Sequence, residues 1–265
     1  MSSVPAIEAS PAVVPERPEA YLPGDRRLAL AAGGELPDRV RGAAIFADIS
    51  GFTRLTEELA REHGPRRGAE ELTGHLNRIF HAVIGELGRF GGDVIYFSGD
   101  AVTCWIDGDD GARAVAAALA MQRALDRVGE IMTPSGASIR LGMKVAVAVG
   151  PARRFLVGDP EIQLIEVLAG RLIDDLAQAE AHAERGEVVL DPAARASLGR
   201  RVEIAVERQD AATGRTIAVV GRLTVDVDEI PPRAEVDLLD DEQVRPWILP
   251  AVYDRLRAGR GALLA

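Results

Sequence analysis

The sequence predicts an α+β domain of ferredoxin-like type, in which a mixed or antiparallel sheet carries helices packed on one face. Short apolar runs closed by turns alternate with longer segments whose apolar residues recur at helical spacing. The resulting order of elements is β-α-α-β-β-α-β, followed by further α and β segments. Hydrophobic residues make up 47% of the 265-residue chain, which is enough to build a packed core.

The first half of the domain is expected to begin with a buried strand. Residues 43–47 are apolar, and Asp48 and Gly51 close this run, as at the end of a strand. A helix should start at about Phe52 and end before Pro65, because proline lacks the N–H group that a helix interior needs. The segments expected next are an amphipathic helix over 72–87, a hairpin with strands over 94–97 and 101–106, and a helix over 111–128.

The second half contains shorter elements. Alternation of side-chain polarity predicts a strand over 139–149, which the apolar residues 155–157 extend. The remaining elements are a helix over 168–184, a strand over 187–190, a closing hairpin with strands over 201–207 and 215–226, and a terminal helix over 244–257.

The composition divides the chain into one domain with tails. The domain is expected over residues 41–226, because this part carries the periodic apolar segments. The tails are a proline-containing flexible leader (1–22), an N-terminal arm (23–40), an acidic linker (227–242) and a C-terminal helix or connector (243–265).

The charge balance excludes several partner classes. The net charge is −10, whereas nucleic acids and anionic membranes require clustered cations. The single cysteine, Cys104, rules out an internal disulfide and suits a reducing cytosol. No apolar run reaches the roughly 18 residues of a membrane span. We therefore expect a cytoplasmic protein without nucleic-acid or membrane partners, in which metals and backbone amides bind any phosphate.

Two aspartates form the strongest chemical signal. Asp48 follows the first buried strand, and Asp100 lies in the turn of the next hairpin. In a sheet of this order the first strand lies beside that hairpin, so the two carboxylates are expected to converge at one edge. Close carboxylates repel each other unless a cation separates them, and Mg²⁺ takes one or two carboxylates together with substrate phosphates. Taken singly, each aspartate is also typical of a helix cap or a turn.

The residues after Asp48 add a phosphate-binding element. Ile49, Ser50, Gly51, Phe52 and Thr53 lead directly into the expected helix, whose first backbone N–H groups have no partner within the helix. Such a helix start binds phosphate without basic side chains. A chain of negative net charge can therefore still bind a triphosphate.

The residues 46–53 and 97–101 together resemble the two metal motifs of class III adenylyl and guanylyl cyclases. The similarity extends over about residues 40–195, and residues 68–72 and 91–95 also fit. Within the family, the chain is most similar to the first cyclase domain of soluble, bicarbonate-type adenylyl cyclases and of bacterial tandem cyclase–ATPase proteins. The resemblance implies the class III cyclase fold.

The resemblance also implies a reaction. Asp48 and Asp100, with the carbonyl of Ile49, would bind two Mg²⁺ or Mn²⁺ ions. Attack of the ribose 3′-hydroxyl on the α-phosphorus would then give a 3′,5′-cyclic nucleotide and pyrophosphate. ATP is the expected substrate by similarity to the soluble adenylyl cyclases, and GTP is the less favoured alternative.

The chain departs from the family at the groups that a second half supplies. Tyr96 stands at the position of the base-selecting lysine, and Asp174 and Gln178 stand at those of the transition-state asparagine and arginine. Pro151 replaces a phosphate-binding arginine, for which Arg153 and Arg154 are the nearest alternatives. Lys144 and Asn77 are the only lysine and asparagine of the chain, so no shift of the alignment restores the set.

These departures predict a metal-donating half of a cyclase. It would be nearly inactive as a homodimer and would need a complementary domain carrying the lysine, asparagine and arginine. The alternative is a degenerate cyclase-like domain that binds nucleotide or regulates a partner without activity of its own. A diguanylate cyclase is disfavoured, because the acidic continuation that such a site needs after Gly91–Asp93 is missing.

Overall fold

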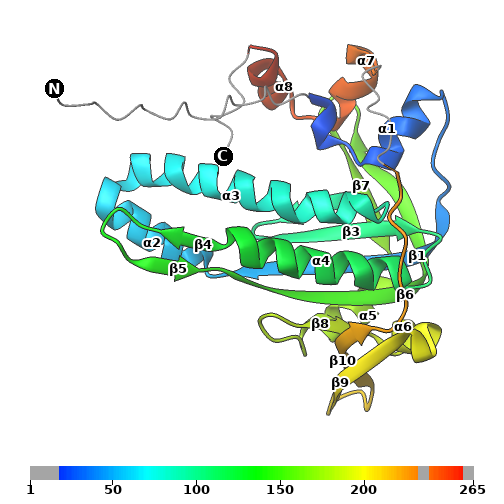
Figure 1. The fold of residues 1–265 in the computed structure, drawn as a ribbon. Helices are drawn as coiled ribbons and strands as arrows, with labels where there is room; N and C mark the ends of the chain where they lie inside the picture. Colours follow the sequence, from blue (N-terminus) through cyan, green and yellow to red (C-terminus); the bar gives the residue numbers. More distant parts are fainter. Residues whose placement is uncertain (1–17, 232–238, 259–265) are drawn as a thin grey trace.

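The computed structural model describes residues 18–231 and 239–258. Most of the expected leader (1–17), part of the expected acidic linker (232–238) and the end of the C-terminal segment (259–265) lie outside the described residues. Figure 1 shows a central sheet with long helices along one side and short terminal helices gathered at one end.

The central sheet has eight strands and mixed direction. Its order is β2-β3-β1-β6-β8-β10-β9, and β7 pairs with the far part of β6. The β6–β8 pair is parallel, and the other pairs are antiparallel. The strands are β1 (Arg39–Ser50), β2 (Asp93–Ser98), β3 (Ala101–Asp107), β6 (Gly142–Asp159), β7 (Gln163–Ala169), β8 (Val188–Leu190), β9 (Val202–Gln209) and β10 (Thr216–Leu223).

The helices α2 (Phe52–His63), α3 (Pro65–Arg89) and α4 (Ala112–Val128) cover one face of this sheet. Alternate residues of β1, among them Ile45 and Ile49, point to this face and are fully buried with the apolar sides of the three helices. This agrees with the expected two-residue period in the strand and the helical period in 72–87. Gly51 precedes α2 in a left-handed conformation (φ 105°), and Pro65 is the first residue of α3.

The opposite face is covered in part by α5 (Arg171–Glu180). Its residues Leu172, Leu176 and Ala179 are buried against Ala44 of β1 and Ala146 of β6. The α+β class and the mixed sheet predicted from the sequence are confirmed. The helices expected on one face are present there as α2, α3 and α4, and α5 in addition covers small residues on the other face.

Several short elements were not predicted from the sequence. These are β4 (Glu130–Met132), its hairpin partner β5 (Ser138–Arg140), the strand β7 and the helix α6 (Pro192–Leu198). The helix predicted over 168–184 is shorter, because its first residues belong to β7 and Gly170, with φ 113°, precedes α5. Residues 155–157 continue the sheet as expected, within β6.

The two ends of the described chain meet in a small cluster beside β7. The N-terminal part consists of η1 (Pro18–Tyr21) and α1 (Gly24–Ala31), and the C-terminal part of α7 (Asp241–Val244), η3 (Arg245–Trp247) and α8 (Pro250–Arg257). Leu22 is buried together with Trp247, Ile248 and Tyr253. The helix predicted over 244–257 is thus interrupted, since Pro246 and Pro250 each begin a separate short helix.

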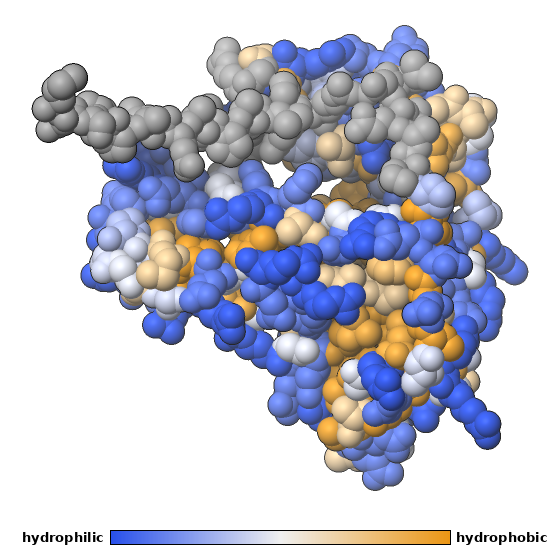
Figure 2. All heavy atoms as spheres, in the orientation of Figure 1, coloured by the Kyte–Doolittle hydropathy of each residue, from blue (hydrophilic) through white to orange (hydrophobic). Residues whose placement is uncertain are grey.

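The surface is largely hydrophilic over the outer sides of α3 and α4, with hydrophobic residues between them (Figure 2). More hydrophobic residues gather at the end of the molecule where β8, α6 and β10 lie. Within residues 18–231 and 239–258, no helix combines the length and apolarity that crossing a bilayer would require.

Candidate active site

Asp48 lies near the end of β1, on the face of the sheet that α5 covers. Its neighbours Ala47 and Ile49 are fully buried on the helical face, so alternation along the strand directs Asp48 to the other side. The Asp48 side chain is 27% exposed. The strand therefore holds a carboxylate in fixed position while leaving it open to small ligands.

Asp100 follows Gly99 in the turn between β2 and β3 and is exposed. In the β1–β3 register Asp48 faces Ala101, the residue after Asp100. The backbone N–H of Ile49 also donates a hydrogen bond of 3.2 Å to the carbonyl of Asp100. The register therefore brings the two aspartates to neighbouring positions at the same end of the sheet.

The loop after β1 leads into α2, whose N-terminus has no side-chain cap. Gly51 is the residue that precedes the helix, and no side chain caps it. The first N–H groups of α2, those of Phe52 and Thr53, have no carbonyl within the helix to bond to. Phe52 is buried and fixes the loop, Thr53 is exposed, and the Ser50 hydroxyl donates to the carbonyl of Gly142 at 3.2 Å.

This donor set fits a magnesium-type ion in chemistry. Two carboxylates and the nearby Ile49 carbonyl are hard oxygen ligands, and Mg²⁺ completes such a shell with water and substrate phosphates. Within the described residues, no three His, Cys, Asp or Glu side chains lie together as a full metal cage.

Lys144, which the sequence analysis left out of the site, lies directly beside Asp48 and links it to Glu180. Lys144 of β6 faces Asp48 in the β1–β6 register, and its Nζ is 3.3 Å from Asp48 Oδ2. Lys144 also forms an ion pair with Glu180 at the end of α5. The hydrogen bond that Lys144 donates to Glu180, with a smaller contribution from Asp48, raises the pKa of Lys144 above its ordinary value, so it carries its charge at neutral pH.

Three of the positions at which the chain departs from the cyclase family, Tyr96, Asp174 and Gln178, lie on the side of the sheet that α5 covers. Tyr96 aligns across β3 with Thr103 and Phe46, one row from Asp48, and is partly buried. Asp174 is exposed on α5. Gln178 accepts a hydrogen bond of 2.8 Å from Arg215, which also pairs with Asp175. These side chains contribute no free cation near the two aspartates.

Arg153 and Arg154 do not replace the arginine that is missing at Pro151. Arg154 is 2% exposed and is held by Glu166 and Asp25 in a buried ionic network. Arg153 pairs with Asp38 at the surface. Neither arginine therefore offers an unpaired guanidinium group, and Arg154 is in addition buried.

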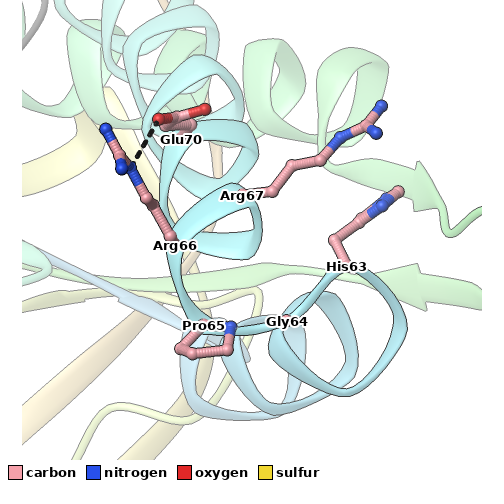
Figure 3. A pocket seen from close by; sticks show the side chains of 6 residues that line it. All are labelled: His63, Gly64, Pro65, Arg66, Arg67 and Glu70. Atoms are coloured by element: carbon pink, nitrogen blue, oxygen red, sulfur yellow. Dashed lines mark ion pairs between the residues drawn. The ribbon is translucent and has the colours of Figure 1, made fainter.

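A separate hollow at the α2–α3 junction does not belong to this site. His63, Gly64, Pro65, Arg66, Arg67 and Glu70 line it (Figure 3). Arg66 turns towards Glu70 at 3.8 Å, and Arg67 extends away from that pair. His63 lies 3.1 Å from Glu71. The hollow lies at the far end of α2 from the Gly51 loop, about 18 Å away along the twelve-residue helix.

The chain is similar in sequence to mammalian adenylate cyclases. It is 30% identical to human adenylate cyclase type 10 over 158 residues, which is 58% of this chain and 10% of that protein. With the rat protein of the same name it shares 29% identity over 154 residues, or 57% of this chain and 9% of the relative. The chain thus spans about a tenth of the length of these curated relatives. No family model matches it.

Solved cyclase structures share the fold. The adenylyl cyclase CyaB from P. aeruginosa superimposes with a TM-score of 0.55 and 20% identity, covering 75% of this chain and 97% of its own. The guanylate cyclase domain of RhGC from Catenaria anguillulae, in complex with GTP, gives 0.55 and 17%, covering 71% and 100%. A bacterial light-regulated adenylyl cyclase gives 0.57 and 19%, covering 78% and 59%.

Proposed function

We propose that this chain is a class III nucleotidyl cyclase catalytic domain, and that it is the metal-donating half of an adenylyl cyclase that is active only with a complementary half; its similarity to human adenylate cyclase type 10 and its shared fold with solved cyclases support this. The observation that carries this proposal is the pairing of β1 with β3. It brings Asp48 and Asp100 together next to an uncapped helix start, which is a suitable arrangement for a metal-bound triphosphate.

The reaction is the cyclisation of ATP. The ribose 3′-hydroxyl oxygen attacks the α-phosphorus and loses its proton, and the bond from that phosphorus to the pyrophosphate oxygen breaks. Asp48, Asp100 and the Ile49 carbonyl would hold two Mg²⁺ or Mn²⁺ ions, which supply Lewis-acid stabilisation of the attacking and leaving oxygens. The N–H groups of Phe52 and Thr53 orient the phosphates.

A partner is needed because transition-state groups are missing. Tyr96, Asp174 and Gln178 offer neither a cation for the adenine site nor a donor pair for the α-phosphate. Loss of one such preorganised contact commonly lowers the rate by about 10²–10³. A homodimer would lack the set at both of its sites. We therefore assign the lysine, asparagine and arginine to another domain.

The decisive experiment mixes this chain with a class III cyclase domain that carries those three residues, and measures cyclic AMP with ATP and Mn²⁺. We expect activity from the mixture, almost none from this chain alone, and loss of activity when Asp48 or Asp100 is replaced by alanine. Equal activity of this chain alone would refute the need for a partner. Substitution of GTP for ATP in the same mixture tests the choice of base.

A second candidate is a degenerate domain that binds nucleotide or regulates a partner. The contact of Lys144 with Asp48 favours it, because an ammonium group already neutralises the first carboxylate. This candidate predicts that the mixture binds a fluorescent ATP analogue but forms no cyclic AMP, whereas the cyclase half forms product under the same conditions.

A further inference from the structure

Lys144 places a positive charge beside the Asp48 carboxylate of the candidate site. It is the only lysine of the chain and stands in β6 between the fully buried Met143 and Val145. Its ammonium group lies between two carboxylates that come from different elements, Asp48 on β1 and Glu180 on α5. The side chains of Lys144, Asp48 and Glu180 are only 29%, 27% and 23% exposed.

The two carboxylates that pair with Lys144 differ in whether they would also bind the metal. Asp48 Oδ2 is one of the oxygens that a divalent ion would use, and an ammonium group 3.3 Å away repels a second cation at that oxygen. Glu180, by contrast, lies on α5 and has no part in the Asp48–Asp100 pair. Lys144 can therefore leave Asp48 without becoming unpaired, since its bond to Glu180 remains.

We propose that Lys144 is an internal counter-ion of Asp48 that competes with the divalent metal, and that Glu180 is a positioning residue that retains Lys144 when the metal binds. The inference rests on the proposed function, because it takes Asp48 as a metal ligand. According to this proposal, the contacts that join β1, β6 and α5 through Lys144 control the metal affinity of this half of the site.

The competition can be measured by titrating the full chain with Mn²⁺ alone and following free Mn²⁺ by electron paramagnetic resonance. In Lys144→Met the competitor is gone, and we expect Mn²⁺ to bind about tenfold more tightly. In Glu180→Gln, Lys144 loses its second carboxylate partner and pairs with Asp48 alone, so Mn²⁺ binding should weaken about threefold. The double variant should match Lys144→Met, because Glu180 acts only through the lysine.

The exposed ion pair Arg222–Glu203 provides matched controls. It joins β10 and β9 at 2.8 Å, on the part of the sheet beyond β8. Arg222→Met and Glu203→Gln make the same changes of net charge as the two test variants and should leave Mn²⁺ affinity unchanged. If they shift affinity as much as the test variants do, general electrostatics explains the effect and the proposal fails.

Asp48→Ala separates failure of this inference from failure of the proposed function. Saturable Mn²⁺ binding that is lost in Asp48→Ala, but unchanged in Lys144→Met and Glu180→Gln, would overturn the competition and leave the metal site standing. A double variant that binds more weakly than Lys144→Met would make Glu180 a ligand instead. Absence of saturable binding in every variant, including Lys144→Met, would refute both proposals.

Discussion

The fold should tolerate substitution of Asp48 or Asp100. The Asp48 carboxylate contributes one partly exposed ion pair to Lys144, and Asp100 lies in an exposed turn. Ion pairs of this kind contribute little to stability, because water screens them and side-chain entropy opposes them. An inactive variant at either aspartate can therefore be interpreted as a change in the site.

We predict that Asp48→Ala and Asp100→Ala each change the free energy of unfolding by less than about 1 kcal/mol. Urea denaturation followed by circular dichroism measures this directly. A loss of several kcal/mol in either variant would contradict the prediction, and it would mean that the aspartate holds the sheet together rather than serving a ligand.

A different carboxylate links stability to pH. Glu187 accepts a hydrogen bond of 2.8 Å from Arg208, and this contact lowers the pKa of Glu187 below its ordinary value of 4.5. A lowered pKa in the folded state stabilises the protein above the unfolded-state value, and this contribution is lost as the pH falls through the folded-state value.

We therefore expect Glu187→Gln to be less stable than the wild type by a constant amount at pH 6–8. The difference should shrink as the pH falls below about 4.5. Denaturant titrations of both proteins across this range test it. A difference that stays the same at pH 3 would mean that the charge of Glu187 plays no part.

At the scale of elements, the contact between α2 and α3 depends on a glycine. A Cβ atom built on Gly68 would lie 2.8 Å from the backbone of Leu59 and Ala60 in α2, closer than real side chains approach. Gly74 lies further along the same helix, and a Cβ atom built on it would have nothing within 4 Å. The two glycines thus offer a matched pair within one helix.

We predict opposite effects for the same substitution. Gly68→Ala should destabilise the protein by about 1–3 kcal/mol, because the backbone of α2 cannot move aside without disturbing its packing. Gly74→Ala should stabilise it by about 0.5–1 kcal/mol, because alanine is the better helix former at an open position. Equal shifts of the unfolding midpoint would contradict the close approach.

The elements that the sequence predicted correctly are those with a long periodic signal. The apolar stripe over 72–87 and the alternation over 139–149 each extend over several turns or strand residues, and both elements are present as α3 and β6. The strand β7 was missed because its only buried residues are Glu166 and Leu168, so burial does not follow an apolar pattern. The helix α6 has only seven residues and was too short to show a period.

The candidate site was predictable only in part for a similar reason. Asp48, Asp100 and the loop between Ile49 and Thr53 belong to contiguous motifs that can be read along the chain. Lys144 belongs to no such motif, and only the β1–β6 register brings it opposite Asp48. One signal was nevertheless present: a lone lysine in an otherwise apolar strand needs a carboxylate partner when it is partly buried.

At the scale of the whole molecule, both ends of the described chain are fixed to the β6–β7 hairpin by buried charges. Glu166 of β7 accepts hydrogen bonds from Arg26 of α1 at 3.1 and 3.2 Å, and also binds Arg154 of β6. Arg26 in turn lies over the ring of Trp247, 5.6 Å from its centre. One carboxylate thus connects the N-terminal arm, the C-terminal segment and the strand that precedes α5.

Glu166→Gln should therefore destabilise the protein by about 3–5 kcal/mol, because it leaves buried guanidinium groups without full charge compensation. Faster amide hydrogen exchange should accompany this loss in α1 and η3, whereas α3 and α4, which pack in a separate core, should change only through global unfolding. Glu203→Gln removes an exposed partner of Arg222 and should cost less than about 1 kcal/mol. Equal costs for the two variants would show that the network at Glu166 is not what holds the chain ends in place, since burial is the property that separates them.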